Sequence, residues 1–187
     1  QLLKQFPNDI NLYNISGAAN QGLGNLEEAV EAYKRAISLK PDYADAYYNL
    51  GNALKEQGKL EDAIKAYKKA ITLNPKYAEA YTNLGVTLKD QGDLVKAKEA
   101  YSMAISLNPD CAEAYNNIGV VYYYTQDFDK TTFYLTKALE IQEELGTYDG
   151  LINGYNNIGA IYIYQEKYEE AIKAYQKGLD FAKKIGD

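Results

Sequence analysis

A constant interval between prolines is the feature that most constrains the fold of this chain. The sequence has four prolines, and the same interval separates each from the next: Pro7, Pro41, Pro75 and Pro109. Glycine and tyrosine recur with the same step, at Gly17, Gly51, Gly85 and Gly119 and at Tyr13, Tyr47, Tyr81 and Tyr115. A fixed period of about 34 residues indicates repeated supersecondary units that bury their apolar faces by stacking on one another.

Residues 44–77 show what one unit contains. Its first half has apolar or small residues at i, i+3, i+4 and i+7, the spacing of one helix face: Tyr47, Leu50, Gly51 and Leu54. Its second half repeats a helical spacing with Ala63, Tyr67, Ala70 and Ile71. Pro75 ends the second helix, because proline disrupts a helix interior. We therefore expect a helical hairpin, with Gly51 where its two helices approach closely.

A hairpin of about 34 residues with this order of aromatic, Leu-Gly, Ala, aromatic, Ala and Pro positions resembles the tetratricopeptide repeat (TPR) family. The resemblance covers nearly the whole chain. It implies an all-α fold, a right-handed α-α superhelix (a TPR solenoid) of about five hairpins preceded by a partial N-terminal helix. The repeats would occupy 1–9 (the end of a truncated repeat), 10–43, 44–77, 78–111, 112–151 and 152–187. We expect a single domain over 1–187, and both ends read as continuing into a longer protein.

The fourth repeat departs from the pattern. Thr131 and Leu135 stand where earlier repeats have Ala and Tyr, and the repeat, 112–151, is longer than those before it. This longer form resembles the repeats of kinesin light chains and of bacterial regulators. The six added residues fall in 138–147, a helical pattern that Gly146 is expected to cap. We expect them to lengthen the second helix by about 9 Å, at about 1.5 Å per residue.

Composition argues against several classes of function. The net charge of −6 leaves no basic stripe, so we expect no nucleic-acid partner. No apolar run is long enough to cross a bilayer, so we expect no membrane partner. The sequence has no histidine and no Cys/His cluster or phosphate-binding loop, and we expect a non-enzymatic protein without cofactor or metal. Cys111 takes a place held by tyrosine in earlier repeats, which indicates packing, and a lone cysteine fits a cytoplasmic location.

One asparagine per repeat recurs on the face of the first helix that such a fold turns toward a groove. Position 6 carries it in four repeats, and Ile15 takes that place in the first: Asn49, Asn83, Asn117 and Asn157. An asparagine amide offers a donor and an acceptor, which match one peptide unit of an extended chain. The row resembles the asparagine ladder in the TPR superhelix of O-linked N-acetylglucosamine transferase, which implies binding of peptide backbone. The alternative is that these amides bond only to neighbouring helices and to water.

Other positions on the same helical face change character along the chain. They carry Asn52, Lys55 and Lys89 in the earlier repeats and Tyr123, Tyr124 and Tyr164 in the later ones. Tyrosine suits protein recognition, because it supplies a large contact area with few rotatable bonds. The alternative is that Tyr123 and Tyr124 fill space created by the longer repeat.

These features predict a protein–protein interaction scaffold that binds a partner protein or an extended peptide in a concave groove. Two alternatives stay open, namely the substrate-presenting arm of a larger enzyme such as a glycosyltransferase, and a purely structural spacer. We also expect weak end-to-end self-association, because apolar residues at both ends lack a covering helix. They are Leu2, Leu3 and Phe6 at one end and Ile172, Tyr175, Leu179 and Phe181 at the other.

Overall fold

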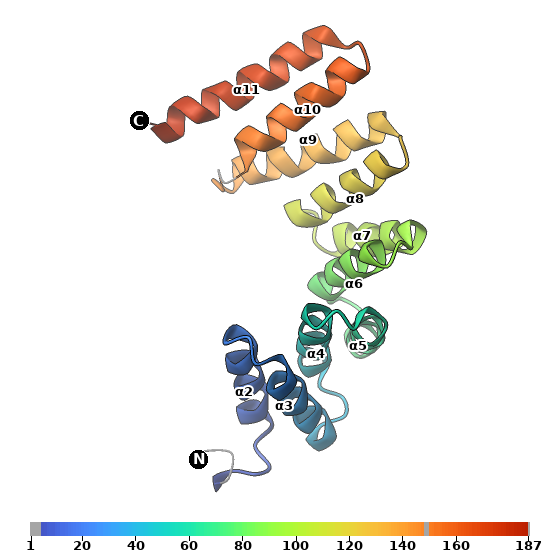
Figure 1. Cartoon of the computed structure of the whole chain (residues 1–187), viewed down its shortest axis with the longest axis vertical. Coiled ribbons are helices and arrows are strands. Elements are labelled where there is room, and N and C mark those ends of the chain that lie inside the picture. Colours follow the sequence, from blue (N-terminus) through green and yellow to red (C-terminus); the bar gives the residue numbers. More distant parts are fainter. Residues whose placement is uncertain (1–4, 148–149, 187) are drawn as a thin grey trace. The chain divides into compact units, whose positions relative to one another are not determined.

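The computed structural model describes residues 5–147 and 150–186, with side chains as far as residue 184. The elements in those residues are all helices (Figure 1): α2 (Ile10–Gly22), α3 (Leu26–Leu39), α4 (Ala44–Glu56), α5 (Leu60–Leu73), α6 (Ala78–Asp90), α7 (Leu94–Leu107), α8 (Ala112–Tyr124), α9 (Phe128–Glu144), α10 (Leu151–Tyr164) and α11 (Tyr168–Gly186). The predicted all-α repeat fold is confirmed.

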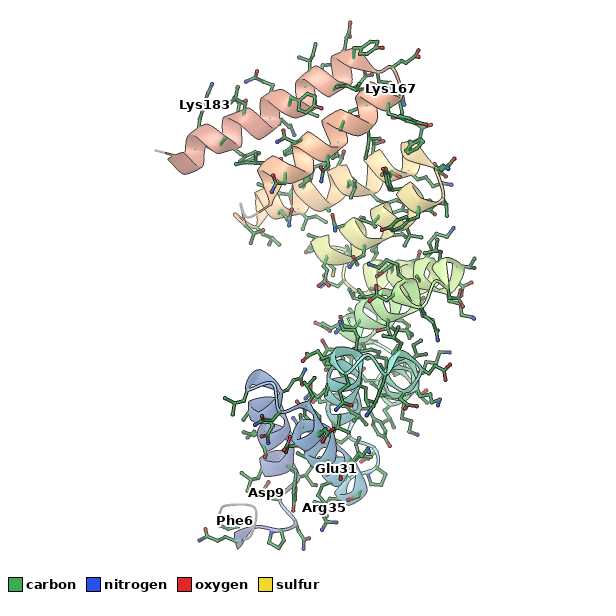
Figure 2. All side chains as sticks on the ribbon, viewed as in Figure 1. Phe6, Asp9, Glu31, Arg35, Lys167 and Lys183 are labelled. Carbon is green, nitrogen blue, oxygen red and sulfur yellow. The ribbon has the colours of Figure 1, made fainter. Side chains whose placement is uncertain are left out.

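Of the expected N-terminal stub, Leu2 and Leu3 lie outside the described residues, and Phe6 is exposed (Figure 2).

Each hairpin turns through the same kind of three-residue connection. Between α4 and α5, the Gly58 N–H donates to the Lys55 carbonyl and the Lys59 N–H donates to the Leu54 carbonyl, both at 2.9 Å. This pair of bonds is a Schellman cap, and it requires a positive φ at its central residue. Gly58 meets the requirement with φ 75°. The equivalent residues, all with positive φ, are Gly24, Gly92, Gln126 and Glu166.

A glycine on the first helix and a tyrosine on the second set the helix separation within a hairpin. A Cβ added to Gly51 would lie 2.6 Å from the ring of Tyr67, and this ring is fully buried. Because that distance is shorter than any van der Waals contact, only glycine fits. The close approach expected at Gly51 is therefore confirmed. The same pairing recurs as Gly17 with Tyr33 and as Gly85 with Tyr101.

The chain forms two compact units, residues 1–107 and residues 108–187. Unit 1 contains α2–α7 and unit 2 contains α8–α11. The core of unit 2 brings together residues of α9, α10 and α11: Leu139, Leu151, Tyr155, Ile158, Ala174 and Phe181. The single domain over 1–187 stays a prediction.

The assignment of Phe181 to an open C-terminal face is wrong. Its side chain is only 8% exposed, and its ring stacks on that of Tyr155, with centroids 6.0 Å apart and planes 4° from parallel. Phe181 therefore belongs to the face of α11 that packs on α10. Ile172 and Leu179 are exposed, as expected for the opposite face. The assignment is also wrong for Tyr175, whose ring packs on α10: a Cβ added to Gly159 would lie 2.8 Å from it.

The six added residues of the fourth repeat do not all extend its second helix. α9 has 17 residues, against 14 in α3, α5 and α7, so the helix gains about 4.5 Å rather than about 9 Å. One further residue joins α10, and two lengthen the connection between α9 and α10. The expected cap at Gly146 is confirmed. Its φ is 68°, its N–H donates to the Glu143 carbonyl at 3.1 Å, and the Thr147 N–H donates to the Gln142 carbonyl at 2.9 Å.

The added turn of α9 has an identifiable structural role. It carries Glu143, whose carboxylate accepts a hydrogen bond from the Tyr155 hydroxyl of α10. Lys177 of α11 lies 3.3 Å from that hydroxyl and 3.8 Å from the Glu143 carboxylate. Burial, followed by the hydrogen bond to Glu143, raises the pKa of Tyr155. The three residues join the three helices at one point, and a 14-residue α9 would end before reaching it.

A second polar contact fixes the α10–α11 turn. Lys167, which Figure 2 shows at this turn, donates to the Asp129 carboxylate of α9 at 2.7 Å, and Gln165 donates to the same oxygen at 3.1 Å.

Among the described residues, no group of three or more His, Cys, Asp or Glu side chains is arranged to hold a metal ion. Within the same residues, no helix combines the length and the apolar character needed to cross a membrane.

Candidate functional site

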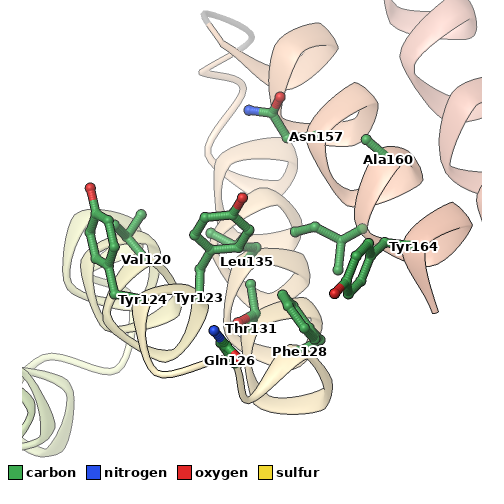
Figure 3. A pocket seen from close by; sticks show the side chains of 11 residues that line it. Val120, Tyr123, Tyr124, Gln126, Phe128, Thr131, Leu135, Asn157, Ala160 and Tyr164 are labelled. Atoms are coloured by element: carbon green, nitrogen blue, oxygen red, sulfur yellow. The ribbon is translucent and has the colours of Figure 1, made fainter.

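Unit 2 contains a pocket of about 750 Å³ between α8, α9 and α10 (Figure 3). It is lined by Val120, Tyr123, Tyr124, Gln126, Phe128, Thr131, Leu135, Asn157, Ala160, Ile161 and Tyr164. None of these side chains is charged at neutral pH, and most are apolar or aromatic. Such a lining with a few polar groups is typical of a binding site.

Two first helices contribute equivalent faces to this pocket. On α8, Val120 and Tyr124 are separated by four residues, and on α10, Ala160 and Tyr164 are separated in the same way. Residues four apart lie on one face of a helix, so each pair projects toward the same side. Asn157 stands one turn before Ala160 on that face. The repeat therefore presents the same pattern twice, on either side of the pocket.

Leu135 accounts for much of the space. It faces Gly119 across the fourth hairpin, where a Cβ on the glycine would lie 2.9 Å from the leucine side chain. In the first three hairpins a tyrosine occupies this place: Tyr33, Tyr67 and Tyr101. Leucine lacks the outer part of the phenol ring, and it lines the pocket. Thr131 beside it is buried and donates its hydroxyl to the Asp127 carbonyl at 2.9 Å, so it is already satisfied within the chain.

A row of four aromatic rings runs along the pocket from α8 to α10. Tyr123 lies 6.2 Å from Tyr124 and 6.0 Å from Phe128, with interplanar angles of 67° and 69°. Phe128 lies 4.9 Å from Tyr164 at 60°. Figure 3 shows Tyr123, Phe128 and Tyr164 around the same space, with Asn157 farther along α10. The three tyrosines are largely exposed, so their surfaces are accessible to a ligand.

Gln126 lies at the edge of the pocket in the turn between α8 and α9. Its φ is 60°, and its N–H donates to the Tyr123 carbonyl at 3.0 Å. A left-handed backbone costs a non-glycine residue about 1–2 kcal/mol. The first three hairpins avoid this cost with glycine. Gln126 therefore places a hydrogen-bonding side chain at the pocket at the expense of backbone strain.

Four of the ten predicted site residues meet in this pocket: Tyr123, Tyr124, Tyr164 and Asn157. Asn117 is half-buried on α8 and does not line it. Phe128, Gln126 and Leu135 line it and were not predicted. The register offers a signal for all three, because they replace the leucine, glycine and tyrosine found at the same positions of the preceding repeat: Leu94, Gly92 and Tyr101.

The predicted site residues of unit 1 make contacts within the chain. The Asn49 amide donates to the Asn14 side-chain oxygen at 3.1 Å. The Asn83 amide donates to the Tyr48 hydroxyl at 3.0 Å and to the Asn52 side-chain oxygen at 2.9 Å. These are bonds to the neighbouring repeat, as the alternative interpretation of the ladder expects. Backbone binding by these asparagines stays a prediction.

Three further residues complete the predicted set in unit 1: Asn52, Lys55 and Lys89. The Asn52 side-chain oxygen also accepts from the Tyr67 hydroxyl at 2.7 Å, so it already receives two hydrogen bonds. Lys89 lies 3.6 Å from the Asp90 carboxylate, and Lys55 is half-buried on α4.

Solved structures of similar fold cover nearly the whole chain. A crystal structure of MamA has a TM-score of 0.80 and 29% sequence identity, covering 91% of this chain and 96% of that one. The crystal structure of YrrB, described as a TPR protein with an unusual peptide-binding site, has a TM-score of 0.73 and 22% identity, covering 96% of this chain and 90% of that one. The peroxisomal targeting signal receptor of Candida glabrata is 46% identical over 48 residues, which are 26% of this chain and 8% of the receptor.

Family models match most of the sequence. The model described as TPR repeat matches residues 22–58 and 51–92. Two models described as Tetratricopeptide repeat match residues 78–111 and 110–184. These matches span residues 22–184, and the chain belongs to the tetratricopeptide repeat family.

Proposed function

We propose that this chain is a non-enzymatic, cytoplasmic interaction protein that binds an extended peptide segment of a partner, and that the pocket of unit 2 is its principal contact. The observation that carries the proposal is the row of four aromatic rings along an uncharged pocket of about 750 Å³. Aromatic side chains bury a large area at a small entropic cost, and they are enriched where proteins meet. TPR proteins generally mediate protein–protein interactions, and the structural relative YrrB has a peptide-binding site.

The proposal gives each side chain a role. Tyr123, Phe128 and Tyr164 pack on an apolar side chain of the ligand, while the Asn157 amide binds one peptide unit beside it. Asn117 provides a second amide on α8. In unit 1, contacts from the half-buried asparagines and from Lys55 and Lys89 are secondary in this proposal, because those side chains are partly engaged within the chain.

The two alternative functions relate differently to the pocket. A substrate-presenting arm of a larger enzyme would use the same pocket, so it differs only in what the rest of such a protein does. A structural spacer has no use for three largely exposed tyrosines around a cavity. Peptide binding is therefore the function that the geometry supports best.

The substitution Leu135→Tyr tests this function, because it restores the residue found in the first three hairpins. The ring should fill the pocket while the hairpin keeps its stability, since the other four hairpins already pair glycine with tyrosine. Peptides selected by the parent chain from a displayed random library should bind the variant about tenfold to a hundredfold more weakly, the loss typical of an interface hot spot. Fluorescence polarisation measures the affinity, and circular dichroism measures the melting temperature.

The matched control is Val95→Tyr, which adds the same ring to an exposed position of unit 1. It should leave peptide affinity unchanged. Selection of no peptide by the parent chain, or equal affinity of the parent and Leu135→Tyr, would contradict the proposed function.

A further inference from the structure

The charges of the chain are divided unequally between its two units. Residues 1–107 contain 13 basic and 13 acidic residues, whereas residues 108–187 contain 7 basic and 13 acidic ones. The whole net charge of −6 therefore belongs to unit 2, the unit that contains the aromatic pocket. A field of one sign attracts partners of the opposite sign and repels others.

Within unit 2, two of the three helices that line the pocket, α8 and α10, carry no cation. α8 has one charged residue, Glu113, and α10 has none. All lysines of the unit lie on α9, on α11 or in the turn between α10 and α11: Lys130, Lys137, Lys167, Lys173, Lys177, Lys183 and Lys184. The position that carries Lys55 and Lys89 in earlier repeats carries Tyr123 and Ile163 here. An acidic or phosphorylated ligand would find no partner on these two helices.

Two carboxylates lie beyond the two ends of the pocket. Glu113 stands seven residues before Val120 on the same face of α8, which is about 10 Å along the helix. Glu166 follows Tyr164 by two residues, in the turn after α10. Both are exposed, and neither forms an ion pair within the described residues. The two acids nearest to the α8–α9 turn are instead neutralised, Asp127 by Lys130 at 2.8 Å and Asp129 by Lys167 at 2.7 Å.

The lining itself favours an apolar ligand group. No charged side chain lines the pocket, and a ligand charge placed there would lose its hydration without gaining a partner. The four rings offer edges and faces to an aliphatic or aromatic side chain. An extended peptide advances about 3.3 Å per residue, so the distance of about 10 Å from Val120 to Glu113 corresponds to about three peptide residues.

Building on the proposed function, we propose that the pocket takes a large apolar side chain from a peptide segment that carries lysine or arginine about three residues away. The apolar side chain packs among Tyr123, Phe128 and Tyr164. The basic side chain lies near Glu113 or Glu166. The ligand class is thus a basic peptide with one apolar anchor, and acidic or phosphorylated peptides are rejected.

The test is selection of displayed random dodecapeptides against the full chain, followed by affinity measurements in about 20 mM salt, where screening is weak. The selected pool should have a net positive charge and a Leu, Ile, Met, Phe or Trp at a fixed distance from Lys or Arg. The double variant Glu113→Gln/Glu166→Gln should bind these peptides about threefold to tenfold more weakly, the loss expected for two exposed ion pairs. Replacing the peptide lysine by glutamine should weaken binding to the parent chain but not to this variant.

The matched control is Glu169→Gln/Glu170→Gln on α11, which changes the net charge equally at two exposed positions away from the pocket. It should alter affinity by less than about twofold. A pool that is acidic or lacks basic residues, or equal losses in the two double variants, would overturn this inference. In that case the proposed function still holds if Leu135→Tyr weakens binding about tenfold or more. Failure to select any peptide instead counts against the function itself.

Discussion

Gln126 keeps a backbone conformation that glycine holds at the same place in the first three hairpins. The Schellman cap is intact there, with its two hydrogen bonds at 3.0 Å from Gln126 and from Asp127. The residue type has therefore changed without any change of local structure. Glu166 shows the same exchange in the last hairpin, but it does not line the pocket. Both residues therefore carry the same backbone cost, but only Gln126 lines the pocket.

Replacing Gln126 by glycine should raise the free energy of unfolding by about 1 kcal/mol. The left-handed backbone costs glutamine about 1–2 kcal/mol in the folded chain, and glycine removes this cost. Part of the gain is lost, because glycine makes the unfolded chain more flexible and so stabilises it. Urea denaturation measures the change. Glu166→Gly should stabilise the chain equally, whereas Gln126→Gly should also weaken peptide binding by removing a side chain that lines the pocket. A loss of stability in both variants would contradict the assignment of strain.

Asn83 and Asn157 occupy the same repeat position but should respond differently to alanine. Asn83→Ala removes two hydrogen bonds between repeats, and we expect a loss of about 1–2 kcal/mol in urea denaturation. Asn157 is exposed at the pocket, so Asn157→Ala should change stability by less than about 0.5 kcal/mol while weakening peptide binding about fivefold. Unchanged stability of Asn83→Ala would show that this amide is not a structural link.

At the scale of helices and hairpins, the sequence predicted those features that depend on nearby residues. The Gly51 contact and the Gly146 cap follow from spacing and from backbone requirements within one hairpin. The length of α9 was not predictable in this way, because its last turn depends on the contact of Glu143 with Tyr155 in another helix. A period in the sequence gives register, but it does not give the partner that decides where a helix stops.

The candidate pocket was predictable only in part for the same reason. Tyr123, Tyr124 and Tyr164 were found from helical spacing, because residues on one face of a helix project together. Phe128 belongs to the start of the following helix, and only the packing of that helix brings it beside Tyr164 at 4.9 Å. Leu135 contributes space to the pocket, because it lacks the phenol ring that tyrosine has at the same position of other hairpins. Its effect appears only when the hairpin is compared with its neighbours in three dimensions.

The tyrosines of the hairpins predict a loss of stability in alkali. Burial, with a smaller contribution from Glu56, raises the pKa of Tyr33 from 10.0 to about 12, and burial also raises the pKa of Tyr67 and Tyr155. These phenols stay protonated in the folded chain when they ionise in the unfolded chain. Their contribution to the free energy of unfolding is therefore complete below pH 10 and declines as the pH rises from 10 toward 12.

Urea midpoints at a series of pH values from about 8 to about 11, together with the ultraviolet absorbance of phenolate, measure this effect. Tyr33→Phe should flatten part of the decline. The exposed Tyr124 provides a control, since Tyr124→Phe should leave the profile unaltered. A constant midpoint up to about pH 11 would contradict the link between these buried phenols and stability.

At the scale of the whole molecule, the exposed face of α11 is the feature with the clearest consequence for assembly. Three aromatic or aliphatic side chains recur along it at intervals of four and seven residues: Tyr168, Ile172 and Leu179. They are between 49% and 68% exposed, and intervals of this kind form one stripe of a helix. In a repeat protein such a stripe is the surface on which another helix packs. We therefore expect weak self-association of the chain through this face, which becomes stronger as the concentration rises.

The corrected place of Phe181 changes how this expectation is tested. Because Phe181 belongs to the core of unit 2, its substitution would unfold the helix rather than alter the stripe. Ile172→Lys/Leu179→Lys is the suitable variant, since both side chains are exposed. Its control is Val95→Lys/Met103→Lys, which adds the same charge at two exposed apolar positions of α7.

Light scattering over a hundredfold range of concentration should show association of the parent chain and of the control, and a monomer for the α11 variant. A contact between the C-terminus of one copy and the N-terminus of the next is heterologous, so the mass should keep rising instead of stopping at a dimer. A parent chain that stays monomeric throughout, or association that both variants retain, would exclude this use of α11.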